Sequence, residues 1–370
     1  MSKIKIVILA ARYYNHKMEL TIGGIQSYMT KMAEGLSSLY DVYIVQKHEV
    51  PFKINNNDYT VIGVNESTDL YAKREILRED DIIICSTENI DISIKWPKMI
   101  LIQHGIYWDL PVKLVSNSFI AKLFPNVYHF LDMYRIFKKF RRFSKIVTVD
   151  YNVYNHFKCI NPQSKRSVNV IPNFVDDRFF EYKRNFTSQK NDKVRVLIAR
   201  RFFKMRGVLI VAEAIEKFNI NNPKNNVEFI FSGEGPEEKK LQELASNHFN
   251  VKVVKTSFAE MPNLMAKCDV SIIPSIGSEG TSLSLLEAMG SGHLTLCTPV
   301  GGMSNIIIDR FNGYFFYPCV DDLYQKLKFI LDSFPEQNHI RMNAISTAKN
   351  GFSYSIWINK WKQEIAKFQK

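Results

Sequence analysis

The sequence predicts an α/β protein made of two doubly wound parallel-sheet domains that face each other across a cleft. With 370 residues, the chain is longer than a single hydrophobic core usually organises. Near-continuous runs of Val and Ile alternate with amphipathic segments of helical period, which is typical of strands covered by helices on both faces of a sheet. The polar stretch 176–192 divides two series of these units. We therefore predict an N-terminal domain over residues 1–175 and a C-terminal domain over residues 190–350.

The elements of both domains follow from apolar runs that end in polar or glycine-containing loops. In the N-terminal domain these runs predict strands at 4–10, 41–46, 59–64, 81–86, 99–104 and 145–150, with helices at 25–39 and 71–78. In the C-terminal domain they predict strands at 194–200, 227–232, 251–255, 269–274 and 294–298, with helices at 208–218, 237–247, 261–267 and 282–289. A Trp- and Lys-bearing helix over 353–370 is expected to pack back on the N-terminal domain.

Cysteine usage and hydropathy are typical of a cytoplasmic protein. The five cysteines are scattered, odd in number and without a CxxC pair, which argues against a disulfide framework and against a zinc site. The sequence has no run of about 18 apolar residues, so no transmembrane helix is expected. We therefore expect a protein of the reducing cytoplasm that does not span a membrane.

Half of the formal net charge of +12 is concentrated in residues 119–145, where seven Lys and Arg face one Asp. A helix in this segment places its apolar residues on one side, namely Phe130, Met133, Phe137 and Phe140. Its basic residues then lie on the opposite side, namely Arg135, Lys138, Arg142 and Lys145. Two interpretations stay open: peripheral docking on anionic lipid at the inner face of the cell membrane, or an ordinary surface helix. Nucleic acid is not an expected partner, because no binding motif accompanies the charge.

The most informative stretch is 275–289, where an expected strand ends in a Gly/Ser loop that opens a helix. The loop carries Glu279, and Glu287 follows about two helical turns later. Between them, the backbone N–H groups of Gly280, Thr281 and Ser282 begin the helix and are free to hold an anion. An anion cradle flanked by two carboxylates that accept hydrogen bonds from hydroxyl groups suits a nucleotide-sugar, in which a diphosphate joins two polyols.

Three further motifs lie at strand ends or helix starts. Arg201 and Arg206 precede a helix in the turn after strand 194–200, and guanidinium groups bind phosphate in bidentate fashion. Gly23 and Gly24 open a helix where a backbone can approach a phosphate closely, but their pattern is not GxGxxG, which counts against a dinucleotide. His104 ends strand 99–104 at the edge of the sheet where ligands bind, so it is placed to donate a hydrogen bond to substrate.

On these residues the chain resembles glycosyltransferase family 4, whose members are retaining enzymes with the GT-B fold of two facing Rossmann-like domains. The resemblance runs from Gly23 nearly to the C-terminus. Its landmarks are Gly23-Gly24-Ile25, His104-Gly105, residues 170–176, the Arg201…Arg206-Gly207 turn, residues 233–236, the E-x7-E pair Glu279 and Glu287, and Gly301-Gly302. The sequence departs from the family pattern at four places, namely Phe174, Arg206, Thr281-Ser282 and Asn305.

The resemblance implies a role for each site residue. It implies that Arg201 and Arg206 hold the donor diphosphate and that Glu287 binds the ribose hydroxyls. It also implies that Glu279 contacts the transferred sugar and that His104 contacts a hydroxyl of the same sugar. Gly24 approaches the phosphates from the N-terminal domain. No metal ion and no cofactor beyond the donor are implied, since the cationic side chains take the place of a divalent ion.

We therefore expect a retaining glycosyltransferase that moves a hexose-type sugar from a nucleoside diphosphate to a hydroxyl of a glycan or lipid-linked acceptor. Bacterial surface polysaccharide or glycolipid synthesis is the expected setting. Two alternatives stay open. A nucleotide-sugar epimerase of the same fold releases a changed donor without an acceptor, and a non-catalytic scaffold uses the basic segment to bind a membrane or a partner.

Overall fold

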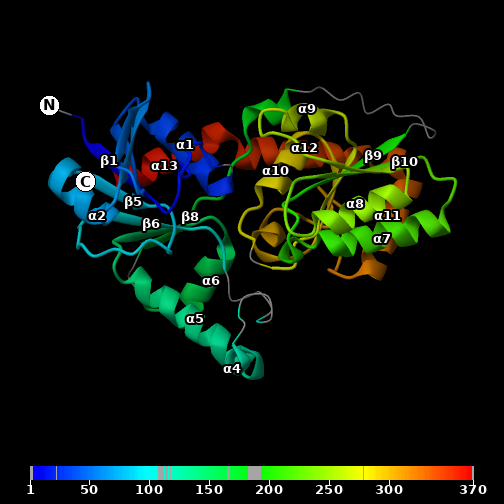
Figure 1. Cartoon of the computed structure of the whole chain (residues 1–370), viewed down its shortest axis with the longest axis horizontal. Coiled ribbons are helices and arrows are strands. Elements are labelled where there is room, and N and C mark those ends of the chain that lie inside the picture. The colour runs from blue at the N-terminus through cyan, green and yellow to red at the C-terminus, as the bar shows by residue number, and fades with distance from the viewer. Residues whose placement is uncertain are drawn as a thin grey trace. The chain divides into compact units, whose positions relative to one another are not determined.

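The computed structural model describes residues 3–21, 23–106, 112, 116, 118–164, 167–181, 193–277 and 279–368. The chain forms two compact units (Figure 1). Unit 1 consists of Met1–Gly105, Phe124–Pro172 and Trp357–Lys370, and unit 2 consists of Ile106–Leu123 and Asn173–Ile356. Each unit is built on its own sheet covered by helices, which confirms the predicted α/β class.

Unit 1 contains an eight-stranded sheet in the order β3-β4-β2-β1-β5-β6-β7-β8. Neighbouring strands are parallel except β3, which runs antiparallel to β4. The strands are β1 (Lys5–Ala10), β2 (Asp41–Lys47), β3 (Phe52–Asn55), β4 (Tyr59–Val64), β5 (Ile82–Cys85), β6 (Met99–Gln103), β7 (Lys145–Thr148) and β8 (Ser167–Val170). The sequence does not predict β3 and β8, because these edge strands are mostly half-buried or exposed and lack a continuous apolar run.

The helices of unit 1 include α1 (Gly24–Leu36), α2 (Thr68–Tyr71) with the π-helical turn Ala72–Ile76, α6 (Tyr151–Ile160) and most of α13 (Tyr354–Ala366). Helix α13 packs on α1 through two buried tryptophans. The Trp361 Nε1–H donates a hydrogen bond of 2.8 Å to the Tyr28 hydroxyl, and the Trp357 ring meets the same tyrosine edge-on at 4.8 Å. Lys145 of β7 pairs with Glu364 at 3.3 Å. The C-terminal end of the chain thus completes the core of unit 1.

The basic segment forms helices α4 (Phe119–Leu123) and α5 (Pro125–Phe140), and Lys145, expected on the basic side of a helix, is the first residue of strand β7. Phe137 and Phe140 are buried against Phe157 of α6, with ring centroids 5.4 and 5.7 Å apart. Phe130, expected on the same buried side, is 58% exposed. The sequence periodicity misplaces Phe130 because tertiary packing buries only the C-terminal half of α5.

None of the helices in the described part of the chain combines the length and the apolar character needed to cross a bilayer.

Unit 2 contains a six-stranded parallel sheet in the order β11-β10-β9-β12-β13-β14. The strands are β9 (Val194–Ala199), β10 (Val227–Ser232), β11 (Val251–Val254), β12 (Val270–Ile273), β13 (Leu294–Cys297) and β14 (Tyr314–Phe315). The helices are α7 (Val208–Asn221), α8 (Glu238–Asn247), α9 (Met261–Ala266), α10 (Leu283–Gly290), α11 (Val320–Asp332) and α12 (Asn338–Phe352). Short 3₁₀ turns form at Asp177–Phe180, Lys204–Arg206, Gly301–Asn305 and Phe334–Gln337. Strand β14 is not predicted, since two residues give no periodic signal.

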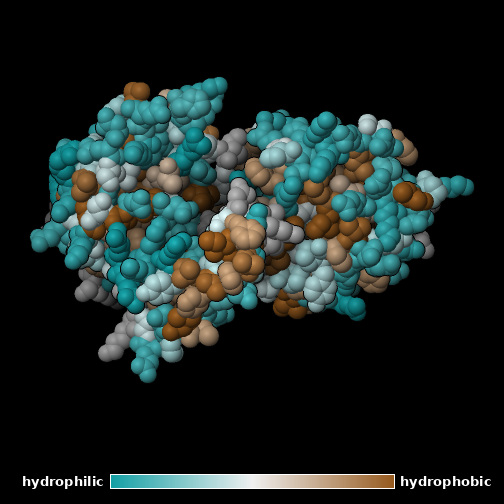
Figure 2. All heavy atoms as spheres, turned by 60° about the horizontal axis from the view of Figure 1, so that its bottom comes forward, coloured by the Kyte–Doolittle hydropathy of each residue, from teal (hydrophilic) through white to brown (hydrophobic). Residues whose placement is uncertain are grey.

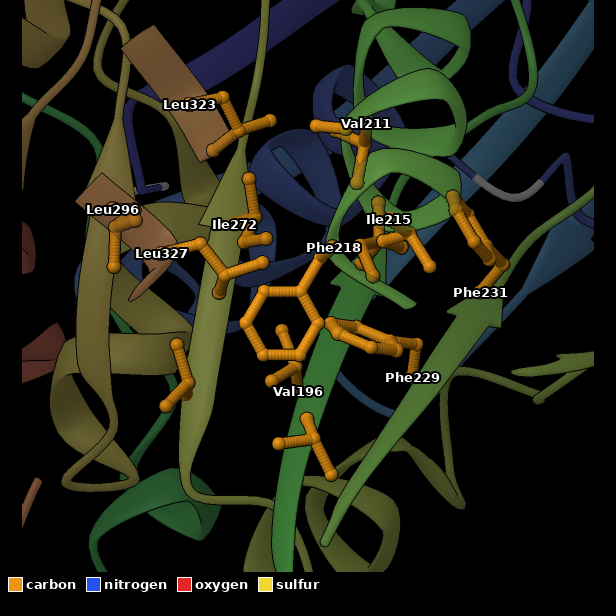
Figure 3. Packing of buried hydrophobic residues seen from close by; sticks show 14 of the residues in the cluster. Val196, Val211, Ile215, Phe218, Phe229, Phe231, Ile272, Leu296, Leu323 and Leu327 are labelled. Carbon is orange, nitrogen blue, oxygen red and sulfur yellow. The ribbon is translucent and has the colours of Figure 1, made fainter. Parts of the chain in front are cut away.

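The two faces of this sheet are covered by different apolar clusters. On one face, Val196 of β9 and Phe229 of β10 pack under α7, where the Phe218 ring lies 5.8 Å from the Phe229 ring (Figure 3). On the other face, Leu197 of β9 packs in a cluster that contains Leu285 of α10. Burial on both faces explains why these strands read as continuous apolar runs. Packing on both faces also holds β9, β12 and α10 in place, and these elements carry the candidate site.

Candidate active site

A charged cluster in unit 2 begins with Arg200, the residue directly after β9. Its backbone N–H donates to the Ser232 carbonyl at 3.0 Å, which continues the pairing of β9 with β10 beyond the last strand residue. The Arg200 side chain is only 8% exposed. Its guanidinium donates to Ser275 Oγ at 2.5 Å, to Ser284 Oγ at 3.3 Å and, as an ion pair, to Glu279 Oε1. One buried guanidinium therefore joins the end of β9 to the loop after β12 and to the start of α10.

Arg206 reaches the same carboxylate from the 3₁₀ turn that precedes α7. The turn ends at Gly207, which has a positive φ of 71°. A Cβ atom at Gly207 would lie 1.8 Å from the Pro274 carbonyl oxygen, so only glycine lets this turn pack against the end of β12. This close approach brings the Arg206 guanidinium into an ion pair with Glu279 Oε1.

Glu279 is a buried carboxylate held by three donors. Its Oε1 atom accepts from Arg200, from Arg206 and, at 2.6 Å, from Ser275 Oγ. Burial raises the pKa of Glu279, but the two guanidinium groups outweigh it and hold that pKa below the usual value. Glu279 is therefore ionised at neutral pH. Two positive charges against one negative charge leave this cluster cationic.

Gly301 and Gly302 support the loop that carries Glu279. Gly301 has a φ of 56°, and a Cβ atom there would lie 1.9 Å from the Glu279 carbonyl oxygen. A Cβ atom on Gly302 would lie 2.5 Å from the Gly280 carbonyl carbon. The Gly302 N–H also donates to the Glu279 carbonyl at 3.1 Å. These glycines thus let one backbone segment pack directly on another.

Helix α10 places the second carboxylate, Glu287, on its second turn. The pKa of Glu287 is raised to about 7 by burial and by the charge of Asp176, against the smaller opposite effects of Arg178 and Arg200. In the described residues the Glu287 side chain has no hydrogen bond or ion pair, so its carboxylate oxygens are available as acceptors. At the start of the helix, Ser282 is the N-cap residue and is buried.

The first turn of α10 offers further polar groups. Thr281 is buried, and its carbonyl accepts a hydrogen bond of 2.6 Å from Asn173 Nδ2. The buried Ser282 hydroxyl finds no partner in the part of the chain that the structure describes. Gly280, Thr281 and Ser282 therefore form the expected buried loop at a helix N-terminus, where backbone N–H groups can hold an anion.

Arg201, the arginine predicted for this site, is exposed, and its guanidinium lies 5.7 Å from the centroid of the Phe203 ring. The neighbour that reaches Glu279 is Arg200, which sequence reasoning did not choose. The signal that singles out Arg200 is its place directly at the end of a buried strand, at the sheet edge where ligands bind, whereas Arg201 is one residue further into the loop.

The remaining predicted site residues belong to unit 1. Gly23 precedes α1 in extended backbone and Gly24 is the first residue of that helix, as expected. His104 follows β6, and its ring meets the Tyr28 ring edge-on at 5.1 Å. Burial lowers the pKa of His104 to about 4, against the opposite effect of a hydrogen bond with the Ser86 backbone, so the imidazole is neutral at physiological pH. Its buried Nε2 atom has no partner within the described residues.

The fold and this site define a class of protein. Residues 179–347 match the family model described as glycosyl transferases group 1. Solved structures with the GT-B fold superpose on the whole chain, so the chain has the GT-B fold. These findings support an enzyme of the glycosyltransferase class, of the group 1 type.

Individual relatives agree with that class. An uncharacterised glycosyltransferase of Methanocaldococcus jannaschii is 24% identical over 100% of this chain and 98% of its own length. Among solved structures, sucrose-phosphate synthase from Thermosynechococcus elongatus is 15% identical with a TM-score of 0.75, covering 99% of both chains. The Anabaena protein HepE, solved in complex with UDP-glucose, is 17% identical with a TM-score of 0.71, covering 98% of both chains.

Proposed function

We propose that this protein is a retaining glycosyltransferase of the family 4 type. It moves a hexose-type sugar from a nucleoside diphosphate to a hydroxyl of a glycan or lipid-linked acceptor, in the synthesis of bacterial surface polysaccharide or glycolipid at the cytoplasmic face of the membrane. The observation that carries the proposal is the buried cluster in which Arg200 and Arg206 share Glu279, with Glu287 on the helix that follows.

The charge of the cluster suits a diphosphate. A guanidinium carries five N–H donors, so Arg200 and Arg206 keep free donors after their contacts with Glu279, Ser275 and Ser284. These donors and the N-terminal N–H groups of α10 stabilise the negative charge that grows on the diphosphate as its bond to the sugar breaks. We propose that they do this without a metal ion.

The carboxylates and His104 suit hydroxyl groups. We assign Glu287 to the ribose hydroxyls, because its carboxylate is half-buried and has no partner in the described part of the chain. We assign Glu279 to the transferred sugar, whose hydroxyls can donate to the second oxygen of its carboxylate. In unit 1, the neutral His104 is assigned to a hydroxyl of the same sugar, and Gly23 and Gly24 to the phosphates. Unit 2 then holds the donor and unit 1 supplies the acceptor side.

A panel of nucleoside-diphosphate sugars tests the proposal, beginning with UDP-glucose because HepE was solved with that compound. We expect one donor to raise the melting temperature and to be hydrolysed slowly when no acceptor is present. Glu287→Ala and Arg200→Gln are expected to weaken both effects strongly. An isomerised donor among the products would instead identify an epimerase. No response to any donor, with both variants indistinguishable from the wild type, would refute the proposed activity.

A further inference from the structure

Unit 1 contains a cavity of ≈ 540 Å³ at the C-terminal end of α5, and most of its polar lining is cationic. Five basic side chains line it, namely Arg135, Lys138, Lys139, Arg141 and Arg142. The carboxylates on the cavity wall are Glu88 and Asp91. Burial raises the pKa of Glu88 above its usual value. The positive charge and the hydrogen-bond donors of the cavity lining therefore suit an anion.

Two of the five basic side chains hold the cavity wall through hydrogen bonds, and the other three do not. Lys139 Nζ donates to the Glu88 carbonyl at 3.0 Å, and Arg142 donates to the Ile92 carbonyl, so both hold the opposite wall. The other three side chains are exposed, and none of them makes a side-chain hydrogen bond or ion pair within the described residues: Arg135, Lys138 and Arg141. Guanidinium groups with free paired donors bind phosphate in bidentate fashion.

The exposed face of α5 continues from these cations into an apolar surface. Five large hydrophobic side chains in and just before the N-terminal half of α5 are between 47% and 58% exposed, namely Phe124, Val127, Phe130, Leu131 and Tyr134. Figure 2 shows brown, hydrophobic surface near the centre of its view. Residues four apart share a helix face, so Arg135 follows Leu131 and Lys138 follows Tyr134 along one side. One face of α5 is thus apolar over its first half and cationic over its second half.

The protein's own core does not account for this surface. The buried residues of α5 are Ile136, Phe137 and Phe140, all in its C-terminal half. Contiguous exposed apolar side chains on a helix mark an interaction site, and cations beside them select an anionic partner.

We propose that α5 docks this protein on a bilayer that contains anionic phospholipid. The apolar first half of the helix enters the region between headgroups and acyl chains, and the cavity at its other end takes a lipid phosphate through Arg135, Lys138 and Arg141. Charge complementarity selects this occupant, because residues 119–145 carry half of the net charge of the whole chain. The apolar and cationic halves also match the order of acyl chain and phosphate in a phospholipid. This docking does not depend on the proposed transfer activity.

Vesicle flotation of the full-length protein without any nucleotide-sugar tests the proposal. We expect binding to vesicles of phosphatidylcholine with phosphatidylglycerol, and none to phosphatidylcholine alone. Neutralising the three free cations (Arg135→Gln, Lys138→Gln and Arg141→Gln together) is expected to weaken binding about a hundredfold. A charge-matched control changes three exposed lysines of unit 2, namely Lys224→Gln, Lys239→Gln and Lys349→Gln, and should bind like the wild type.

The apolar half is tested at constant charge. Phe130→Ser should weaken vesicle binding, whereas Phe249→Ser, at a position that is 94% exposed in unit 2, should not. Equal losses in the charge-matched control would overturn the proposal in favour of net charge alone. If millimolar inorganic phosphate protects the wild type but not the triple variant from heat, and the wild type does not bind vesicles, then the cavity binds a free anion instead. A dimer in light scattering that Phe130→Ser disperses would assign the apolar face to a second copy.

Discussion

Arg200 and Arg201 are adjacent in the chain but lie in opposite surroundings, so replacing each of them by Gln tests the site directly. Arg200 is buried and contacts Glu279, Ser275 and Ser284. Breaking a buried ion pair by removing one partner costs about 3–5 kcal/mol. The remaining Arg206 still neutralises Glu279, so we expect Arg200→Gln to lower the free energy of unfolding by about 2–3 kcal/mol.

Donor binding should show the same contrast. Two charge-assisted hydrogen bonds to phosphate at about 1.5 kcal/mol each amount to about 3 kcal/mol, so Arg200→Gln should lower kcat/KM for the donor about a hundredfold. Arg200→Lys should recover only part of this loss, because a lysine cannot reproduce the planar fork. Arg201→Gln should change stability by no more than about 0.5 kcal/mol, since exposed substitutions away from packed features usually do little.

Urea unfolding and donor hydrolysis measured on both variants provide the assay. The wild type and Arg201→Gln should coincide in both measurements, and Arg200→Gln should fall below them in both. If Arg201→Gln loses donor turnover while Arg200→Gln keeps it, then Arg201 holds the diphosphate and the geometry of the cluster has been misread. Loss of stability without loss of turnover in Arg200→Gln would make the cluster purely structural.

Three further predictions concern the pH dependence, the loop glycines and α5. Because the pKa of Glu287 is raised, the folded protein keeps the Glu287 proton up to a higher pH than the unfolded chain does. The protonated Glu287 therefore contributes stability below about pH 4.5, and this contribution is lost as the pH rises to about 7. Glu287→Gln should abolish that loss, which amounts to up to about 3 kcal/mol in urea unfolding at pH 5 and pH 8. Gly301→Ala should cost at least about 1–2 kcal/mol and reduce donor hydrolysis, whereas Gly351→Ala, with open space around its Cβ position, should not destabilise the protein. Phe140→Ala should cost about 3–5 kcal/mol in unfolding, while Phe130→Ala should have little effect on stability.

The central strands could be predicted from the sequence because a strand that is buried on both faces consists of a nearly continuous run of apolar residues. In unit 2, β9, β10, β12 and β13 all lie within one residue of their predicted bounds, since their apolar runs have no exposed positions to interrupt them. Edge strands leave a weaker trace. Strand β3 alternates between half-buried and exposed residues and pairs with only one neighbour, so nothing in the local pattern separates it from a loop.

Side-chain partners were harder to predict, because they depend on segments far apart in the chain. Glu279 and Glu287 could be singled out from their spacing and from the loop between them. Whether Arg200 or Arg201 meets Glu279 depends on where the pairing of β9 with β10 ends, which local periodicity does not encode. The buried face of α5 likewise depends on which of its turns Phe157 covers. Both difficulties have the same origin, since a helical or extended period gives relative directions but not the partner.

Glu279 explains how two guanidinium groups can stay together in a buried place before any donor arrives. The two guanidinium groups repel each other because their charges have the same sign, and burial adds a desolvation cost to each of them. A single carboxylate oxygen shared by Arg200 and Arg206 offsets both effects and fixes the two side chains in one arrangement. The cluster still carries one net positive charge, and a diphosphate brings two negative ones. Full neutralisation then requires donors beyond the two arginines, and the N–H groups at the start of α10 lie on the loop that holds Glu279. The proposed donor site is therefore preorganised by the same carboxylate that is assigned to the sugar.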